Sequence, residues 1–178
     1  KTNATVTPNV TTAPDGTLTA DTITAAASTG SNKYIYQNYT LSADTYSVTF
    51  QVKYNNHRWI MIREYNGVTS YAGSFDILNG VVGAVSGVTS SITPKGNGWF
   101  DCTITATVEA GAGNILLAMN NSDSASFTGW TSVGSEAVYI LGAQLEAADY
   151  AGVYVPTTDS PASGGEPLRP WSYIETDQ

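Results

Sequence analysis

The sequence is poor in cysteine, histidine and charged residues. It has one Cys and one His, and Asp, Glu, Lys and Arg together make up 12% of its 178 residues. A single cysteine excludes an intrachain disulfide. A single histidine, without Cys or carboxylates at ligand spacing, leaves no motif for a zinc site or a catalytic dyad. Cys102 lies in the alternating run 100–104, so we expect its thiol to be a small core side chain rather than a nucleophile.

Basic residues and long apolar runs are also scarce. Seven Lys and Arg stand against fifteen Asp and Glu, which gives a formal net charge of -8 and a sequence pI near 4.3. Nucleic-acid affinity needs Lys and Arg facing phosphates, so this balance argues against nucleic acid and anionic membranes as partners. No apolar run is long enough to cross a bilayer, so membrane insertion is not expected. The acidity favours solubility and neutral or cationic partners.

Thr, Ser, Asn, Gly and aromatic residues take the place of the scarce charged residues, and this composition suits strands and turns. Short alternating runs recur between turn signals such as Asn66-Gly67, Asn79-Gly80 and Gly96-Asn97-Gly98. Strands are expected at residues 17–27, 33–41, 46–54, 58–65, 74–78, 81–85, 99–108, 115–120 and 137–146. No helical periodicity of useful length is present. The pattern predicts an all-β chain, an antiparallel β-sandwich or a barrel, with the sandwich preferred.

The domain organisation predicted from composition is simple. Residues 1–12 are rich in Thr, Asn and Pro and are expected to be an extended lead-in. Residues 13–158 are expected to form the sandwich. Residues 159–178 are rich in Pro, Ser and Gly and are expected to be a linker or a docked tail, with Trp171 as a docking anchor.

Several motifs resemble those of a known family. The run Gly98–Thr105 resembles a "GWYRCSIT"-like strand, and Val138–Glu146 followed by 154–157 resembles a "YIWGAQLE…SYIPT" signature. Residues 13–21 and 75–80 fit the same pattern. Together they are similar to jelly-roll modules of bacteriophage tail fibres and other virion proteins, which resemble carbohydrate-binding modules of families 4, 9 and 22. The resemblance implies a jelly-roll sandwich, a sugar ligand and a virion or secreted location. Asp101 departs from it, because a basic residue is common at that position.

Residues 57–65 carry the main candidate site. If Ile60 and Ile62 point into the core, the alternation puts His57, Trp59, Met61, Arg63 and Tyr65 on the opposite face. Aromatic rings stack on the C–H faces of sugars, and a guanidinium can donate to hydroxyls or to a uronate carboxylate. The alternative is that Trp59 and Tyr65 fill a second hydrophobic layer of the sandwich.

The loop 122–134 carries the second set of candidates. Trp130 in this polar, Gly- and Ser-rich loop is expected to be either a lid over a ligand or an anchor that fixes the loop. Asn120, at the loop's entry, is expected either to bond sugar hydroxyls or to cap the turn.

Jelly rolls of this type often hold a structural calcium between the N-terminal loop and the last strand. By that resemblance, Asp15 and Asp21 on one side and Glu146 on the other are candidate oxygen ligands. The alternative is that Asp15 forms a turn and Glu146 faces solvent.

Three functions remain open from the sequence. The preferred one is a non-catalytic carbohydrate-binding module. The second is a structural or oligomerisation domain of a phage tail protein, with its aromatic residues in a homo-oligomer or a larger virion assembly. The third is a small polysaccharide lyase or glycosidase. A lyase would use His57, Arg63 and a Tyr, whereas a glycosidase needs two paired carboxylates, and no such pairing is recognisable.

Overall fold

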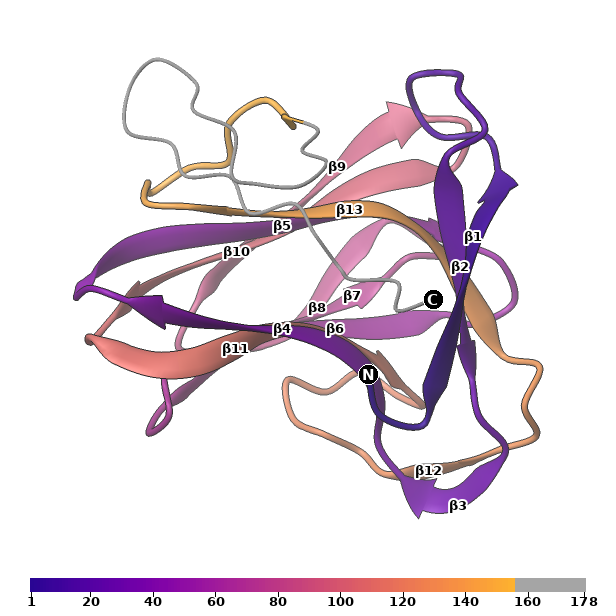
Figure 1. The fold of residues 1–178 in the computed structure, drawn as a ribbon, viewed down its shortest axis with the longest axis horizontal. Coiled ribbons are helices and arrows are strands. Elements are labelled where there is room, and N and C mark those ends of the chain that lie inside the picture. Colours follow the sequence, from indigo (N-terminus) through magenta and orange to yellow (C-terminus); the bar gives the residue numbers. More distant parts are fainter. Residues whose placement is uncertain (156–178) are drawn as a thin grey trace.

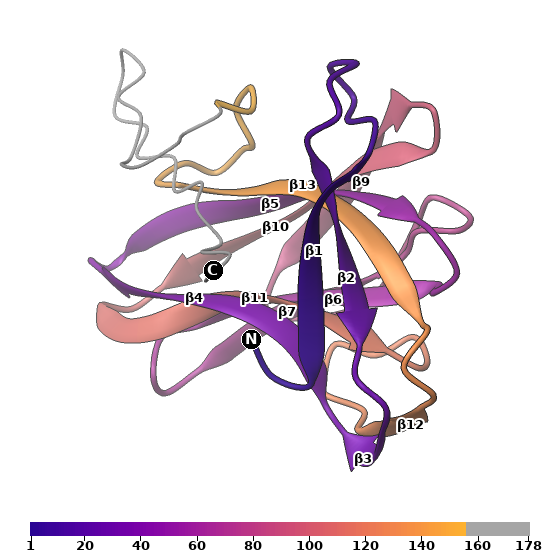
Figure 2. The same ribbon diagram turned by 45° about the vertical axis from the view of Figure 1, so that its right-hand side comes forward.

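The computed structural model describes residues 1–155; the expected tail, with Trp171, lies outside them. Two antiparallel sheets pack face to face, which confirms the predicted sandwich, and none of residues 1–155 is helical. Figures 1 and 2 show the two layers and a short ribbon at one end. No helix in the described part of the chain is long and apolar enough to span a membrane.

The strands divide into three sheets. The six-stranded sheet has the order β1 (Ala4–Thr11), β2 (Ala20–Ala25), β13 (Ala137–Glu146), β5 (Asp44–Tyr54), β10 (Trp99–Val108) and β9 (Thr89–Gly96). The five-stranded sheet has the order β4 (Lys33–Leu41), β11 (Gly111–Asn120), β6 (Trp59–Tyr65), β7 (Ser70–Asp76) and β8 (Val81–Ser86). The two-stranded ribbon is formed by β12 (Trp130–Ser132) and β3 (Ser28–Ser31).

The core lies between the two large sheets and is built by alternation. Val48 and Phe50 of β5 belong to the same buried cluster as Ile60 and Ile62 of β6, and Ile60 and Ile62 are 0% exposed. The predicted inward direction of these two isoleucines is therefore confirmed. Full burial of each such side chain contributes about 1.5–3 kcal/mol. Cys102 is also in this cluster, as expected, and burial raises the pKa of its thiol well above the ordinary value.

A β-bulge in β13 decides which of its side chains face outward. The pairing of β13 with β5 shifts between Ile140 and Gly142, so Leu141 is an extra residue in the strand. One extra residue exchanges the two faces of a strand. As a result Ile140 faces the core before the bulge and Leu145 faces it afterwards, while Gln144 points to the outer face.

Residues expected to be a lead-in belong to the sandwich. Residues 4–11 form edge strand β1, which pairs with β2 in the register Ala4↔Ala25 and Val6↔Ile23. The register shifts beyond Thr7, next to Pro8, and an edge strand tolerates a proline because one side of it needs no ladder hydrogen bond. The sandwich therefore starts before residue 13.

Candidate functional site

The outer face of the five-stranded sheet brings aromatic, amide and guanidinium groups together. Two neighbouring cross-strand rows, set by the pairing of β4, β11 and β6, carry these groups: Tyr36–Leu116–Arg63 and Asn38–Asn114–Tyr65. Adjacent rows on one face of a sheet are about 7 Å apart and adjacent strands about 4.8 Å apart. The six side chains therefore lie within the span of a short oligosaccharide. We call this surface the aromatic face.

A loop adds one more ring to the aromatic face. Residues 121–129 cross the sheet, and Phe127 packs against a buried cluster that includes Met61 and Leu116. The ring of Phe127 lies 5.2 Å from that of Tyr34. The Nδ2 group of Asn120 donates to the carbonyl oxygens of residues 124 and 126, both at 3.0 Å. Asn120 is 1% exposed, so its role is to hold the loop.

Arg63 lies at the centre of the aromatic face. Its guanidinium carbon is 5.1 Å from the centre of the Tyr65 ring and 4.8 Å from that of Phe127. Its Nη2 donates to Asn114 Oδ1 at 3.1 Å. Its Nε is buried without a partner, and among residues 1–155 it forms no ion pair. Burial lowers its pKa, but a guanidinium remains protonated at neutral pH.

Glu64, the neighbour of Arg63 in sequence, does not neutralise it on this face. Glu64 is 1% exposed and turned to the interior, where the hydroxyl of Tyr39 donates to its Oε1. Burial raises the pKa of Glu64, although the hydrogen bond from Tyr39 and the charge of Arg63 act in the opposite direction. The half-buried guanidinium of Arg63 is thus held between the rings of Tyr65 and Phe127, and not all of its N–H groups have a hydrogen-bond partner.

A shallow hollow of about 620 Å³ lies beside Asn114, the hydrogen-bond partner of Arg63. Its lining includes Asn38, Tyr65, Asn114 and Gly113. A Cβ atom at Gly113 would overlap the carbonyl oxygen of Tyr65, so β11 and β6 approach each other here only because this residue is glycine. The hollow is within the 300–1,000 Å³ range typical of small-ligand sites.

His57 and Trp130 lie together, away from the aromatic face. His57 was expected on the outer face of β6, but β6 begins at Trp59, so the alternation does not extend to residue 57. Its ring is stacked on Trp130, with centroids 4.9 Å apart and planes at 15°. Trp130 is 7% exposed, and its Nε1 donates to the carbonyl oxygen of Met119 at 2.9 Å. Of the two roles expected for Trp130, this geometry fits the anchor.

Lys33 also packs against the Trp130 ring. Its Nζ lies 4.4 Å from the centre of the Trp130 ring and donates to the carbonyl oxygens of Trp130 and Ser31. Burial lowers the pKa of Lys33, and the negative charge of Glu136 acts in the opposite direction. The three side chains His57, Trp130 and Lys33 fasten the β3–β12 ribbon to the end of the sandwich.

The stack makes stability dependent on pH. Burial lowers the pKa of His57 below its usual value of 6.5, and the carbonyl of Asn120 and the charge of Glu136 offset only part of this. The unfolded chain therefore binds the His57 proton more readily. The contribution of His57 to the free energy of unfolding is fully present above about pH 6.5 and is lost as the pH falls toward its lower folded pKa.

We expect the difference in unfolding free energy between wild type and His57→Gln to shrink from pH 8 to pH 5 in urea titrations. A difference that stays constant over this range would contradict the assignment.

Trp59 shares the outward direction of Arg63 but lies apart from it. The four residue steps from Trp59 to Arg63 along β6 correspond to about 13 Å. Trp59 is half-buried beneath the guanidinium of Arg58, 5.0 Å from the ring centre, and Arg58 forms an ion pair with Asp76 at 2.6 Å. Trp59 therefore belongs to a separate patch at the other end of the strand.

The three carboxylates expected to hold calcium do not come together. Asp15 accepts hydrogen bonds from the amide and the hydroxyl of Thr17, and Asp21 accepts one from the amide of Asn9. Asp21 is level with Ile140, whereas Glu146 lies six residues further along β13, about 20 Å away. Within residues 1–155 no group of three or more His, Cys, Asp or Glu side chains is placed to hold a metal ion.

Comparisons with known proteins identify no relative. No family model matches the chain, and no curated protein matches it significantly.

Of the candidates predicted from sequence, Arg63 and Tyr65 are on the aromatic face. Its other members, Tyr36, Asn38, Asn114, Leu116 and Phe127, were not predicted, nor was the adjacent ring of Tyr34. The alternation of Tyr34 and Tyr36 in one strand was the available signal, since it places both rings on the same face.

Proposed function

We propose that the protein is a non-catalytic carbohydrate-binding module and that the aromatic face holds the sugar. The observation that carries the proposal is the setting of Arg63, which lies between the rings of Tyr65 and Phe127 and is bonded to Asn114, a residue that lines the hollow. A sugar ring offers C–H groups to the rings and hydroxyls to the guanidinium and the amides.

Tyr36 is the member of this face best placed to stack on a ligand. Its side chain is 40% exposed, and the nearby ring of Tyr34 lies 5.8 Å away at 51°, so the two rings form a tilted pair. Asn38 is exposed in the adjoining row and lines the hollow. Stacking on Tyr36 would place the sugar hydroxyls over Arg63 and Asn114.

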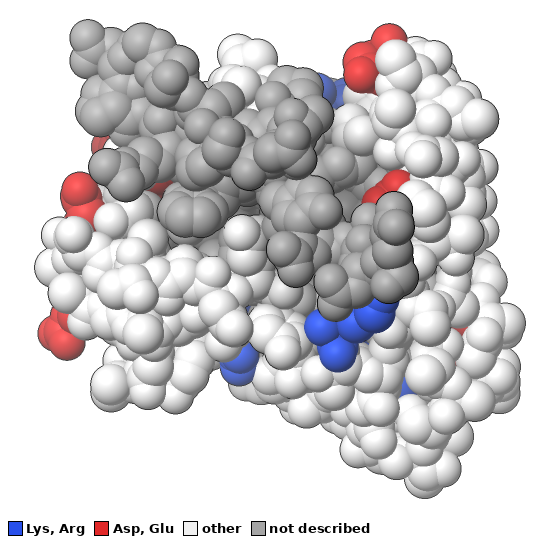
Figure 3. All heavy atoms as spheres, viewed as in Figure 1, with Lys and Arg blue, Asp and Glu red and all other residues white. Residues whose placement is uncertain are grey.

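The formal net charge of -8 favours a neutral glycan over an acidic one as ligand. On the side of the molecule shown in Figure 3, the described surface is mostly uncharged, with acidic and basic groups few and scattered. A single shallow site of this kind binds with micromolar to millimolar Kd, and display of several copies multiplies the avidity. Such display fits a jelly-roll module of a phage virion or of a secreted polysaccharide-active protein.

A glycan array tests the proposal, followed by calorimetric titration of the best ligand with two variants of one residue. Tyr36→Ala removes the ring and is expected to weaken binding about tenfold, whereas Tyr36→Phe keeps the ring and is expected to bind within about twofold of wild type. No binding to any glycan of the array, or equal affinity of both variants, would refute the proposed site.

One observation favours the alternative of an oligomerisation domain. Strand β8 is the last strand of the five-stranded sheet, and its Val81 and Val85 are 54% and 51% exposed. Apolar edge strands are sites of pairing between chains. Light scattering distinguishes the cases: a stable oligomer that Val85→Asp dissociates would support this alternative, and a monomer would remove it.

A further inference from the structure

The outer face of the six-stranded sheet has a different chemistry from the aromatic face. Hydroxyl groups of β5 and β10 are bonded in cross-strand pairs along it, at 2.8, 2.9 and 2.8 Å: Thr45–Thr107, Ser47–Thr105 and Thr49–Thr103. A hydroxyl has one donor and two acceptor positions, so the paired hydroxyls of Thr103 and Thr105, which line the groove described below, keep a position for a ligand. This ladder provides a rigid polar floor.

A groove of about 480 Å³ runs along this floor. Its floor includes Asp101 and Thr105 of β10, one wall includes Thr93 of β9, and the other is the segment 149–152. Asp101 to Thr105 corresponds to about 13 Å of strand, about the length of a disaccharide. Tyr150 lies at the rim and is 65% exposed, so its ring is free to stack on a sugar.

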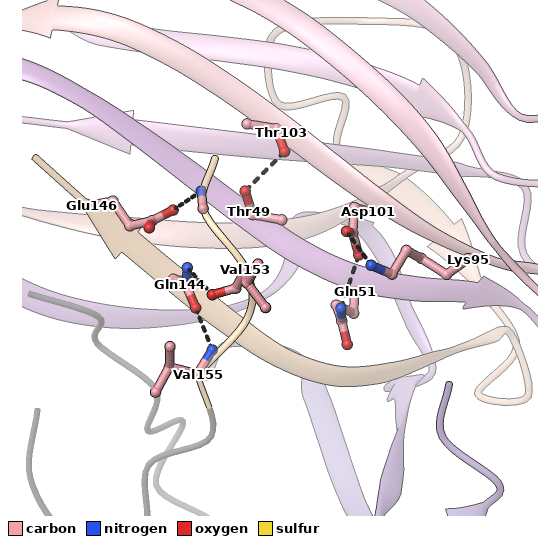
Figure 4. Close-up of polar contacts among 10 residues, drawn as sticks. Thr49, Gln51, Lys95, Asp101, Thr103, Gln144, Glu146, Val153 and Val155 are labelled. Carbon is pink, nitrogen blue, oxygen red and sulfur yellow. Dashed lines mark hydrogen bonds and ion pairs between the residues drawn. The ribbon is translucent and has the colours of Figure 1, made fainter. Parts of the chain in front are cut away.

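The second wall is held by side chains of β13. Glu146 accepts a hydrogen bond from the amide of Gly152 at 2.8 Å, and Gln144 accepts one from the amide of Val155 at 2.9 Å while donating to the carbonyl of Val153 at 3.3 Å. Figure 4 shows these contacts beside the Thr49–Thr103 pair of the floor. Both polar side chains are buried, so the wall is fixed before any ligand arrives.

Asp101 gives the groove an oriented acceptor. Its Oδ1 accepts a hydrogen bond from Gln51 Nε2 at 2.9 Å, and its Oδ2 lies 3.3 Å from Lys95 Nζ (Figure 4). Asp149, in the opposite wall, forms no hydrogen bond or ion pair with residues 1–155. Two carboxylates facing a groove repel acidic sugars and accept hydrogen bonds from sugar hydroxyls.

We propose that this groove is a second binding site, specific for one or two units of a neutral sugar. Hydroxyls of the ligand bond Asp101 and the threonine ladder, and its ring stacks on Tyr150. The groove and the aromatic face lie on opposite outer sides of the sandwich, so one molecule holds two glycan segments at once. This second site does not depend on the first.

Amide chemical shifts measured by NMR test the second site. The probes are methyl α-glucopyranoside, methyl β-galactopyranoside, methyl α-mannopyranoside and N-acetylglucosamine, with sodium glucuronate as the acidic control. We expect at least one neutral sugar to shift the amides of residues 101–105 and 149–152, and glucuronate to leave them unchanged. Unshifted groove amides with every neutral probe, or equal shifts with glucuronate, would overturn the inference.

Two variants and a control separate this site from the aromatic face. Asp101→Asn and Tyr150→Ala are each expected to raise the Kd from the groove titration about tenfold, while Asp44→Asn, an exposed carboxylate of the same sheet outside the groove, leaves it unchanged. Shifts at residues 34–38 and 63–65 report on the aromatic face and remain in all three variants. With the wild-type protein, shifts of the groove amides without any at residues 34–38 and 63–65 refute the proposed aromatic site, and shifts on the aromatic face without any of the groove amides refute the second site.

Discussion

Trp130→Ala is expected to lower the free energy of unfolding by about 3–5 kcal/mol, the range for removing a buried tryptophan. The indole is part of the main core, stacks on His57, lies beside the ammonium group of Lys33 and donates to Met119. Its loss removes all of these contacts and leaves the Lys33 charge without the ring. Urea unfolding followed by circular dichroism measures the change.

Trp59→Ala is the matched control for this prediction. It also removes an indole, but from a half-buried position under Arg58, so the expected loss is smaller, about 1–2 kcal/mol. A Trp130→Ala protein as stable as Trp59→Ala, with weakened glycan binding instead, would mean that Trp130 is a ligand-binding lid and that its role as an anchor is wrong.

Arg63→Lys is expected to weaken glycan binding at least tenfold while the protein stays folded. Lysine keeps the positive charge, but it has no planar fork to stay between the rings of Tyr65 and Phe127 while bonding Asn114. A tenfold loss corresponds to about 1.4 kcal/mol, within the range for a central residue of a binding site. Calorimetric titration of the glycan found by the array measures it.

Arg58→Lys is the control for the loss of a guanidinium. Arg58 also stacks on a ring and is bonded to Asp76, but it lies at the other end of β6. We expect this variant to bind like wild type. Equal losses of glycan affinity in the two variants would point to a general effect of charge or hydration. The central role assigned to Arg63 on the aromatic face would then be wrong.

Much of the fold could be predicted because the long strands carry clear runs of apolar, aromatic and β-branched residues. Strands β4, β10 and β13 have the predicted bounds: β10 alternates apolar and polar residues over most of its length, and β4 and β13 are long runs rich in aromatic and apolar residues. Edge strand β9 was not predicted because it has only Ile92 as an apolar residue and also contains Pro94 and Lys95. Such residues protect an exposed edge from pairing with other chains. They also interrupt the alternation by which a strand is recognised in a sequence.

The candidate site was predicted only where it depended on a single strand. The alternation of β6 correctly turned Ile60 and Ile62 inward and placed Arg63 and Tyr65 on one face. The partners of Arg63 come from β4, β11 and the loop 121–129, and their registers depend on tertiary pairing that no local pattern encodes. His57 was misplaced for the same reason, because the loop path that brings Trp130 against it is set by the β3–β12 ribbon.

A crystal structure of the protein with an oligosaccharide bound is the most direct test of the aromatic face. The account predicts a sugar ring against Tyr36 or Tyr65, with at least one of its hydroxyls accepting a hydrogen bond from the Arg63 guanidinium. Ligand density confined to other surfaces, with Tyr36, Arg63 and Tyr65 free of contact, would contradict it.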